Sequence, residues 1–82
     1  MPPPLTKQDD LKLIRFIQAY QKRHGYAPTV REVMRGLQLR SLCAAHYRLK
    51  RVEELGLVVR RIRSGRAIEV RELAVKQYVL EA

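Results

Sequence analysis

Residues 41–51 offer side chains that could contact the edges of DNA bases. Apolar residues recur in this stretch at steps of three and four, which predicts a helix with one apolar face. The opposite face carries a thiol, an imidazole, a phenol and cationic groups, which suit bonds to base edges and to phosphates. The residues of this face, which we expect to read a DNA major groove, are Cys43, Ala44, His46, Tyr47, Lys50 and Arg51.

Two short helices joined by a tight turn would position this face. Thr29 and Glu32 have the spacing of a capping box, which predicts a helix from Thr29 to about Leu37. Ser41 is a second N-cap residue, and the helix behind it should span about residues 42–55. Two helices joined this tightly match a helix-turn-helix, whose second helix enters the DNA major groove.

The expected core follows from the spacing of apolar residues. In the second helix the apolar stripe comprises Leu42, Ala45, Leu49, Val52 and Leu55. Elsewhere, the residues that we expect to be buried are Leu13, Ile17, Tyr26, Val33, Leu37 and Ile68. Gly56, which follows the stripe, suits the left-handed conformation that ends a helix.

Elements on either side complete the expected domain. A helix over residues 7–24 precedes the pair, with Thr6 as its N-cap and with Asp9 and Asp10 at the positive end of its dipole. After the pair, β-branched residues, a Ser-Gly turn and an alternating segment predict a β-hairpin over residues 57–71. The expected fold class is therefore mainly α with a small β-hairpin, a three-helix winged helix-turn-helix.

The chain divides into three expected parts. Residues 1–5 form a proline-rich, flexible lead-in, and residues 6–71 form the winged helix-turn-helix domain. Residues 72–82 could form a short amphipathic helix or a frayed tail, and they could supply a contact between two copies of the chain.

The chain is strongly basic, with 17 Lys and Arg residues against 8 Asp and Glu residues and a formal net charge of +9. Residues 40–66 carry eight basic and two acidic side chains, so most of the excess lies on the second helix of the pair and on the hairpin, whose tip at 63–66 would be the wing. Such a surface could simply be solvated, but it is also typical of proteins that neutralise DNA phosphates. The residues that we expect at the DNA backbone are Thr29, Arg31, Arg40, Lys50, Arg51, Arg60, Arg63 and Arg66.

Other classes of function have little support in the sequence. Cys43 is the only cysteine, which precludes an internal disulfide and fits a reducing cytoplasm. Within a prokaryotic or phage-infected cell, a DNA-binding protein is expected on the nucleoid. His24 and His46 have no third partner at metal-ligand spacing, so we expect no metal and no cofactor. The sequence has no phosphate-binding glycine loop or catalytic motif, and we do not expect an enzyme. No apolar run approaches the roughly 18 residues that span a bilayer, so no membrane partner is expected.

Several segments, in this order and spacing, resemble those of a known family. They are GYAPT at 25–29, REV at 31–33, Leu37, LRS at 39–41, AA at 44–45, LK at 49–50, GLV at 56–58 and RAIEV at 66–70. Over about residues 5–71 the chain resembles the N-terminal DNA-binding domain of LexA repressors. The resemblance implies a winged helix-turn-helix repressor that binds palindromic operators as a dimer. It also implies that helix 42–55 enters the major groove and that the hairpin lies on the backbone or in the minor groove. The family's base-reading residues lie near the start of that helix, so the resemblance implies base contacts by Ser41, Cys43, Ala44, His46 and Tyr47.

The chain also departs from that family. Cys43, His46 and Tyr47 stand where the best-known members have an asparagine and two glutamates, and Gln38 replaces the glycine of the turn. We therefore expect a different operator. The family's C-terminal domain, which dimerises the repressor and cleaves itself with a serine–lysine pair, is missing from this sequence. The chain would then be either a free-standing regulator, as phages or plasmids encode, or a piece of a longer repressor.

Two other functions stay open. A winged helix with this charge could be a protein-interaction module that binds an acidic protein partner, and its DNA affinity would then be only non-specific. It could also be an architectural protein that binds DNA without sequence preference. Enrichment of bound sequences from a random DNA pool would separate both from a sequence-specific regulator.

Overall fold

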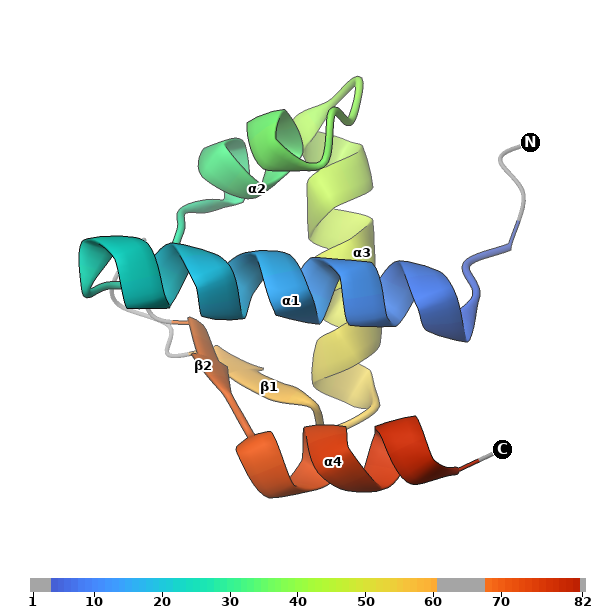
Figure 1. Ribbon diagram of the computed structural model, residues 1–82. Coiled ribbons are helices and arrows are strands. Elements are labelled where there is room, and N and C mark those ends of the chain that lie inside the picture. The colour runs from blue at the N-terminus through green and yellow to red at the C-terminus, as the bar shows by residue number, and fades with distance from the viewer. Residues whose placement is uncertain (1–3, 61–67, 82) are drawn as a thin grey trace.

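The computed structural model describes residues 4–60 and 68–81. Within these ranges the elements are α1 (Lys7–His24), α2 (Val30–Gly36), α3 (Leu42–Glu54), β1 (Val58–Arg60), β2 (Ile68–Val70) and α4 (Glu72–Leu80). In Figure 1, α1 crosses α3, α2 lies beside the first turns of α3, and the hairpin and α4 lie near its other end. The predicted fold class, mainly α with a small antiparallel hairpin behind a helix-turn-helix, is confirmed.

Side-chain caps start the first three helices at the residues that the sequence predicted. At α1, the Thr6 hydroxyl accepts a hydrogen bond from the Asp9 amide at 3.3 Å, and the Asp9 carboxylate accepts one from the Thr6 amide at 2.9 Å. Thr29 and Glu32 form the same reciprocal pair at α2, with bonds of 3.2 and 2.8 Å. The Ser41 hydroxyl accepts a bond of 3.1 Å from a backbone amide in the first turn of α3. These bonds satisfy amide groups that would otherwise lack a partner at a helix start.

Left-handed backbone conformations end these helices or join them. Gly25 has φ 81° at the end of α1 and Gly56 has φ 79° just after α3, as the sequence predicted for Gly56. Gln38, in the turn between α2 and α3, has φ 56° although it carries a side chain. A left-handed residue with a Cβ atom costs about 1–2 kcal/mol, so this turn forms against a local penalty.

The core lies where α1, α2, α3 and the hairpin meet. Its buried apolar residues are Leu13, Ile14, Ile17, Ala27, Val33, Ala45, Leu49, Val52, Leu57, Val58, Ile68 and Val75. Most of the residues that the sequence predicted for the core are among them. Leu37, which was also predicted there, is half-buried and packs against its edge, as does Phe16.

Three residues that we expected in the core lie on the surface instead. Tyr26 is 46% exposed, because its ring lies outside the core against the rings of Tyr20 and His24, at centroid distances of 6.0 and 5.8 Å. Leu42 and Leu55 are 37% and 45% exposed. They stand at the two ends of α3, where the apolar stripe extends past the elements that cover its middle.

The hairpin is antiparallel, with Val58 opposite Val70 and Arg60 opposite Ile68. Val58 and Ile68 are buried, so one face of the small sheet closes the core. Among the described residues β1 ends at Arg60 and β2 begins at Ile68, and residues 61–67 between them are not described. The predicted wing at residues 63–66 lies outside the described residues.

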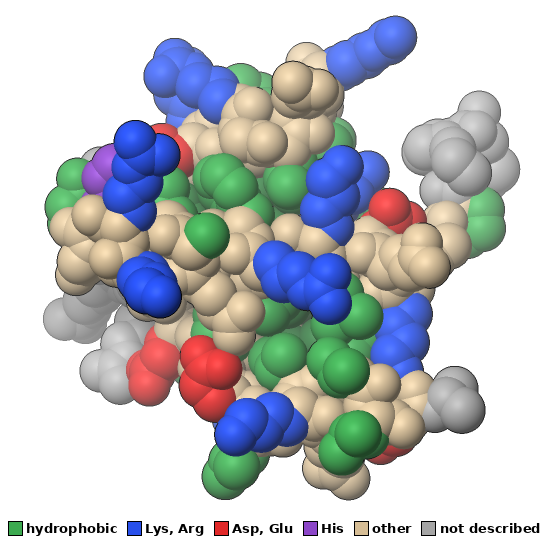
Figure 2. Space-filling view, in the orientation of Figure 1, with side chains coloured by type: hydrophobic (Ala, Val, Ile, Leu, Met, Phe, Trp, Pro, Cys, Tyr) green, Lys and Arg blue, Asp and Glu red, His purple; other side chains and the backbone are tan. Residues whose placement is uncertain are grey.

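The C-terminal segment forms a helix, α4, which is one of the two alternatives that the sequence left open. Val75 is buried against the core, and the Tyr78 hydroxyl donates a hydrogen bond of 2.7 Å to Asp10 on α1. Leu73 and Leu80 are 82% and 84% exposed. Figure 2 shows apolar side chains gathered on the part of the surface where α4 lies.

Candidate nucleic-acid interface

The exposed face of α3 carries the residues that the sequence predicted as base-reading. Ser41, Cys43, His46 and Tyr47 are exposed, and Ala44 is half-buried. The opposite side of α3 is buried in the core, which fixes the orientation of the helix. These five side chains belong to about the first two turns, because one turn takes 3.6 residues. The fold therefore brings them together on one accessible surface.

Lys50 continues this face into the next turn of α3 and is exposed. Together with Tyr47, Arg51 and Glu54, it lines a hollow of about 280 Å³. A flexible ammonium group beside a phenol ring suits contact with a phosphate at the margin of a base-reading surface.

Arg51 lies at the edge of the same hollow, but its guanidinium is bonded inward. Its Nε donates to both carboxylate oxygens of Asp10, at 2.8 and 3.0 Å. Asp10 is 2% exposed and also accepts the hydrogen bond from Tyr78. The bond to Asp10 raises the pKa of Arg51, whereas burial and then the bond to Asp10 raise the pKa of Tyr78. The three side chains form a network that joins α3 to α1 and α4.

This network bears on two expectations from the sequence. Arg51 was expected at the DNA backbone, whereas its guanidinium is bonded to the buried carboxylate of Asp10. Asp10 lies in the first turn of α1, at the positive end of the helix dipole as expected, and it is also buried, which the sequence did not lead us to expect. It precedes Leu13, Ile14 and Ile17 by three, four and seven residues, and therefore shares their buried face. A carboxylate on a buried face requires a partner.

The remaining cations predicted for the DNA backbone are spread over several elements. Arg31 on α2 and Arg40 in the turn before α3 are exposed, and Arg60 on β1 is half-buried. Arg63 and Arg66 lie outside the described residues.

Thr29, which we also expected at the backbone, is enclosed in its capping box. Its amide donates to the Glu32 carboxylate at 2.8 Å, and Tyr20 donates its hydroxyl hydrogen to the same carboxylate. The negative charge of Glu32 therefore stands where a phosphate would have to approach the first turn of α2.

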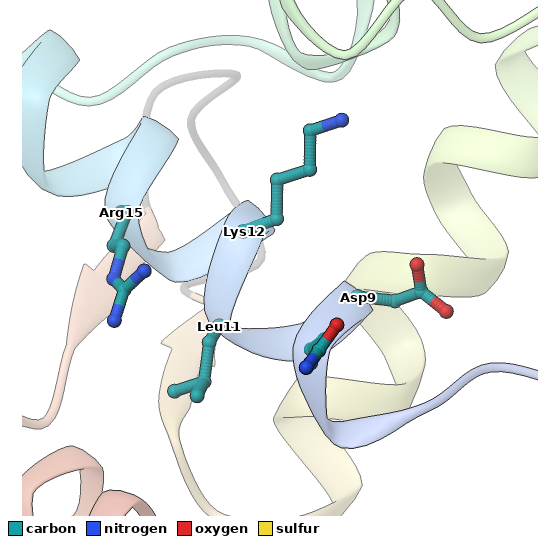
Figure 3. A pocket seen from close by; sticks show the side chains of 5 residues that line it. Asp9, Leu11, Lys12 and Arg15 are labelled. Atoms are coloured by element: carbon teal, nitrogen blue, oxygen red, sulfur yellow. The ribbon is translucent and has the colours of Figure 1, made fainter.

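The outer face of α1 also carries basic side chains, which were not among the residues expected at the DNA. A hollow of about 540 Å³ on this face is lined by Gln8, Asp9, Leu11, Lys12 and Arg15. Figure 3 shows the Asp9 side chain pointing toward α3, and Nη1 of Arg48 lies 3.8 Å from its carboxylate. The hydrogen bond from the Thr6 amide, with a smaller effect of Arg48, lowers the pKa of Asp9. Basic side chains are scattered over this face of the molecule (Figure 2).

Across residues 4–60 and 68–81, no three His, Cys, Asp or Glu side chains gather to hold a metal ion. No helix in those two ranges is both long and apolar enough to pass through a membrane. Cys43 is an exposed free thiol on α3.

Comparison with known proteins agrees with this arrangement. The chain is 36% identical over 66 residues to a LexA repressor of Carboxydothermus hydrogenoformans, an alignment that covers 80% of this chain and 32% of the relative. It is 36% identical over 76 residues to a LexA repressor of Clostridium botulinum strain Hall, with 93% and 37% covered. It is 40% identical over 63 residues to a LexA repressor of Clostridium tetani, with 77% and 32% covered. The chain thus spans about a third of the length of these curated relatives.

The family match covers most of the fold described above. Residues 3–67 match the family described as LexA DNA binding domain. This range contains α1, the capped helices α2 and α3, and the first strand of the hairpin. The order of these elements and the extent of the match show that this chain belongs to the LexA DNA-binding domain family.

Proposed function

We propose that this chain is a sequence-specific regulator of transcription that binds double-stranded DNA and acts as a repressor by occupying its operator. In this proposal α3 enters the major groove, and the hairpin lies along the backbone or in the minor groove. The observation that supports it best is the exposed face of α3. Groups able to bond to base edges lie together there, on a helix whose other side is buried.

The side chains of this face have distinct proposed roles. Ser41, His46 and Tyr47 can donate or accept hydrogen bonds at base edges. Cys43 and Ala44 are small, and they would let the backbone of α3 approach the bases closely. Because a side chain of this size has little reach, the bases opposite it must lie close to the helix.

A second group of residues is proposed to hold the phosphates. Lys50, Arg40 and Arg31 are exposed cations on or near the helix-turn-helix, and Arg60 continues the group onto β1. We add Arg63 and Arg66 to the proposed phosphate-binding group on the basis of the sequence alone, because they belong to the predicted wing. We leave out Arg51, which is bonded to Asp10, and Thr29, whose amide is bonded to Glu32.

The relatives are named LexA repressors, and we propose that, like the family, two copies of this chain bind a palindromic operator. A single module contacts few base pairs, and a second half-site multiplies the specificity. The exposed side chains of Leu73, Val79 and Leu80 on α4 provide apolar surface for a contact between the copies. A symmetric operator motif would support this arrangement.

The experiment that tests the proposed function is enrichment of bound sequences from a random DNA pool, followed by gel shifts on the enriched motif. We expect one motif to emerge. Tyr47→Ala should relax specificity at one position, by about 1–3 kcal/mol of discrimination. Lys50→Ala should weaken binding to all sequences alike and reduce the slope of log affinity against log salt by about one.

The matched control for Lys50→Ala is Arg15→Ala, which removes one positive charge from the outer face of α1. It should leave the affinity and the salt slope nearly unchanged. If no motif emerges and Tyr47→Ala weakens binding to every sequence equally, the protein is a sequence-blind DNA binder instead. Capture of an acidic protein, with DNA affinity only at about 10⁻⁴–10⁻⁶ M, would favour an interaction module.

A further inference from the structure

A further hollow, of about 460 Å³, lies between the start of α3 and the segment that precedes α1. The residues that line it are Pro4, Leu5, Asp9, Ser41, Cys43, Ala44, Tyr47 and Arg48. The segment before α1 and the first turns of α3 are distant in the sequence, and the fold brings them to one surface. The hollow therefore adds residues from the N-terminal segment to the proposed base-reading face.

The walls of this hollow are mostly apolar. The segment before α1 contributes Pro4 and Leu5 to the lining, and the first turns of α3 contribute Cys43, Ala44 and Tyr47. Leu5 is half-buried, although the sequence predicted a flexible lead-in over this segment. Such walls suit an apolar group on the DNA rather than a phosphate, because burying a charge against apolar atoms is unfavourable.

Polar groups form the rest of the lining, and two of them are already engaged. The carboxylate of Asp9 accepts bonds from the amide and the hydroxyl of Thr6, at 2.9 and 3.1 Å, and it lies 3.8 Å from the Arg48 guanidinium. Ser41 uses a lone pair of its oxygen to cap α3. The cap does not use its hydroxyl hydrogen, which can donate to an acceptor in the hollow.

We propose that this hollow is a subsite for the C5-methyl edge of a thymine, and that Pro4 and Leu5 help to determine specificity. In the major groove thymine presents a methyl group next to the O4 acceptor. The methyl group matches the apolar walls, and O4 matches the hydroxyl of Ser41. Cytosine presents an amino donor and no methyl group, so it would leave the apolar walls without a matching group. This inference rests on the proposed function, because it assumes that α3 faces the major groove.

The test replaces each thymine of the enriched operator, one at a time, by deoxyuridine, which lacks only the methyl group. One replacement in the half-site should weaken binding about fourfold, which is the usual effect of one methyl group in an apolar site. At that position 5-methylcytosine should bind more tightly than cytosine. Leu5→Ala should reduce the preference for thymine over uracil to less than about twofold, since the wall then loses its contact with the methyl group. Leu5→Met keeps an apolar wall and should preserve the preference.

The matched control is Leu11→Ala, which shortens the same kind of side chain on the outer face of α1. It should preserve the full preference for thymine, and thermal unfolding of each variant identifies any loss that is due to folding. Equal affinity for thymine and uracil at every position overturns the subsite. A fourfold preference that Leu5→Ala leaves intact overturns the role of the N-terminal wall. Tighter binding of cytosine than of thymine overturns the subsite in favour of Asp9 as an acceptor.

The two proposals fail in different ways. If the random pool yields no motif, the proposed function fails and this subsite fails with it. If a motif emerges and its affinity does not respond to uracil, only the thymine subsite is wrong.

Discussion

Nε of Arg51 on α3 lies 2.8 Å from Oδ1 of Asp10 on α1, and Asp10 is 2% exposed. The pair joins the helix that carries the proposed base-reading face to the first helix of the domain. Tyr78 donates to the same carboxylate, so α4 is attached at the same point. The placement of α3 therefore depends on a buried charge that belongs to another helix.

The two partners of this ion pair should differ in how much stability their replacement removes. Arg51→Met leaves a buried carboxylate without its cation, whereas Asp10→Asn leaves a cation that can turn toward water. We expect Asp10→Asn to lower the free energy of unfolding by about 1–3 kcal/mol, and Arg51→Met to lower it further. Urea denaturation measures both. The control is Arg48→Met, which breaks the longer and more exposed pair with Asp9 and should lower stability by at most about 1 kcal/mol. A loss for Arg51→Met no larger than this control would contradict the structural role of the pair.

Tyr78 should make stability fall at alkaline pH. Burial and the bond to Asp10 raise its pKa in the folded state above the ordinary value of 10.0, although Arg51 acts in the opposite direction. The stability that the protonated phenol contributes is therefore fully present below pH 10.0 and lost as the pH rises through the folded pKa. Tyr78→Phe should lower the free energy of unfolding by about 1 kcal/mol at neutral pH. As the pH rises into strong alkali, the free energy of unfolding should fall less for this variant than for the wild type. The measurement is the urea midpoint as a function of pH, and parallel curves for the two proteins would count against the prediction.

Gln38→Gly should stabilise the protein. Gln38 has φ 56°, a conformation that glycine adopts without the Cβ penalty. Glycine also gives the unfolded chain more conformational entropy, which opposes part of this effect. We expect a net rise of about 1 kcal/mol in the free energy of unfolding. Such a gain raises Tm by about 4–8 °C in a domain of this size, which calorimetry can measure. The control is Gln77→Gly inside α4, which should lower stability by about 1 kcal/mol. No rise in Tm for Gln38→Gly would mean that the turn is not strained.

Gly36→Ala should destabilise the protein even though alanine favours helices. Gly36 is the last residue of α2, and a Cβ atom at this position would overlap the ring of Phe16, which packs against the core. We expect overpacking to lower the free energy of unfolding by about 1–3 kcal/mol. This loss exceeds the stabilisation that alanine provides through its higher helix propensity. Denaturant unfolding tests this, and Phe16→Leu in the same chain should recover part of the loss by making room. A stabilised Gly36→Ala variant would show that the two helices can separate without cost.

Much of the helical fold could be predicted from local patterns. The caps at Thr6, Thr29 and Ser41 depend on partners only three residues away, and each of these helices starts where its cap predicts. The exposed face of α3 follows from the helical period alone, because a buried stripe on one side leaves the other side accessible.

The sequence by itself therefore determined the first three helices, their caps and the residues that face outward from α3, because each of these depends on neighbours within about one helical turn. It left open whether the C-terminal segment forms a helix, which α4 does. Only the tertiary structure decided that Asp10 pairs with Arg51, which is 41 residues away, and that Leu5 and Tyr47 line one hollow. It also decided that Tyr26 lies outside the core. These contacts depend on how α1, α3 and α4 cross, and the packing of many side chains at once sets the crossing, so no local pattern specifies it.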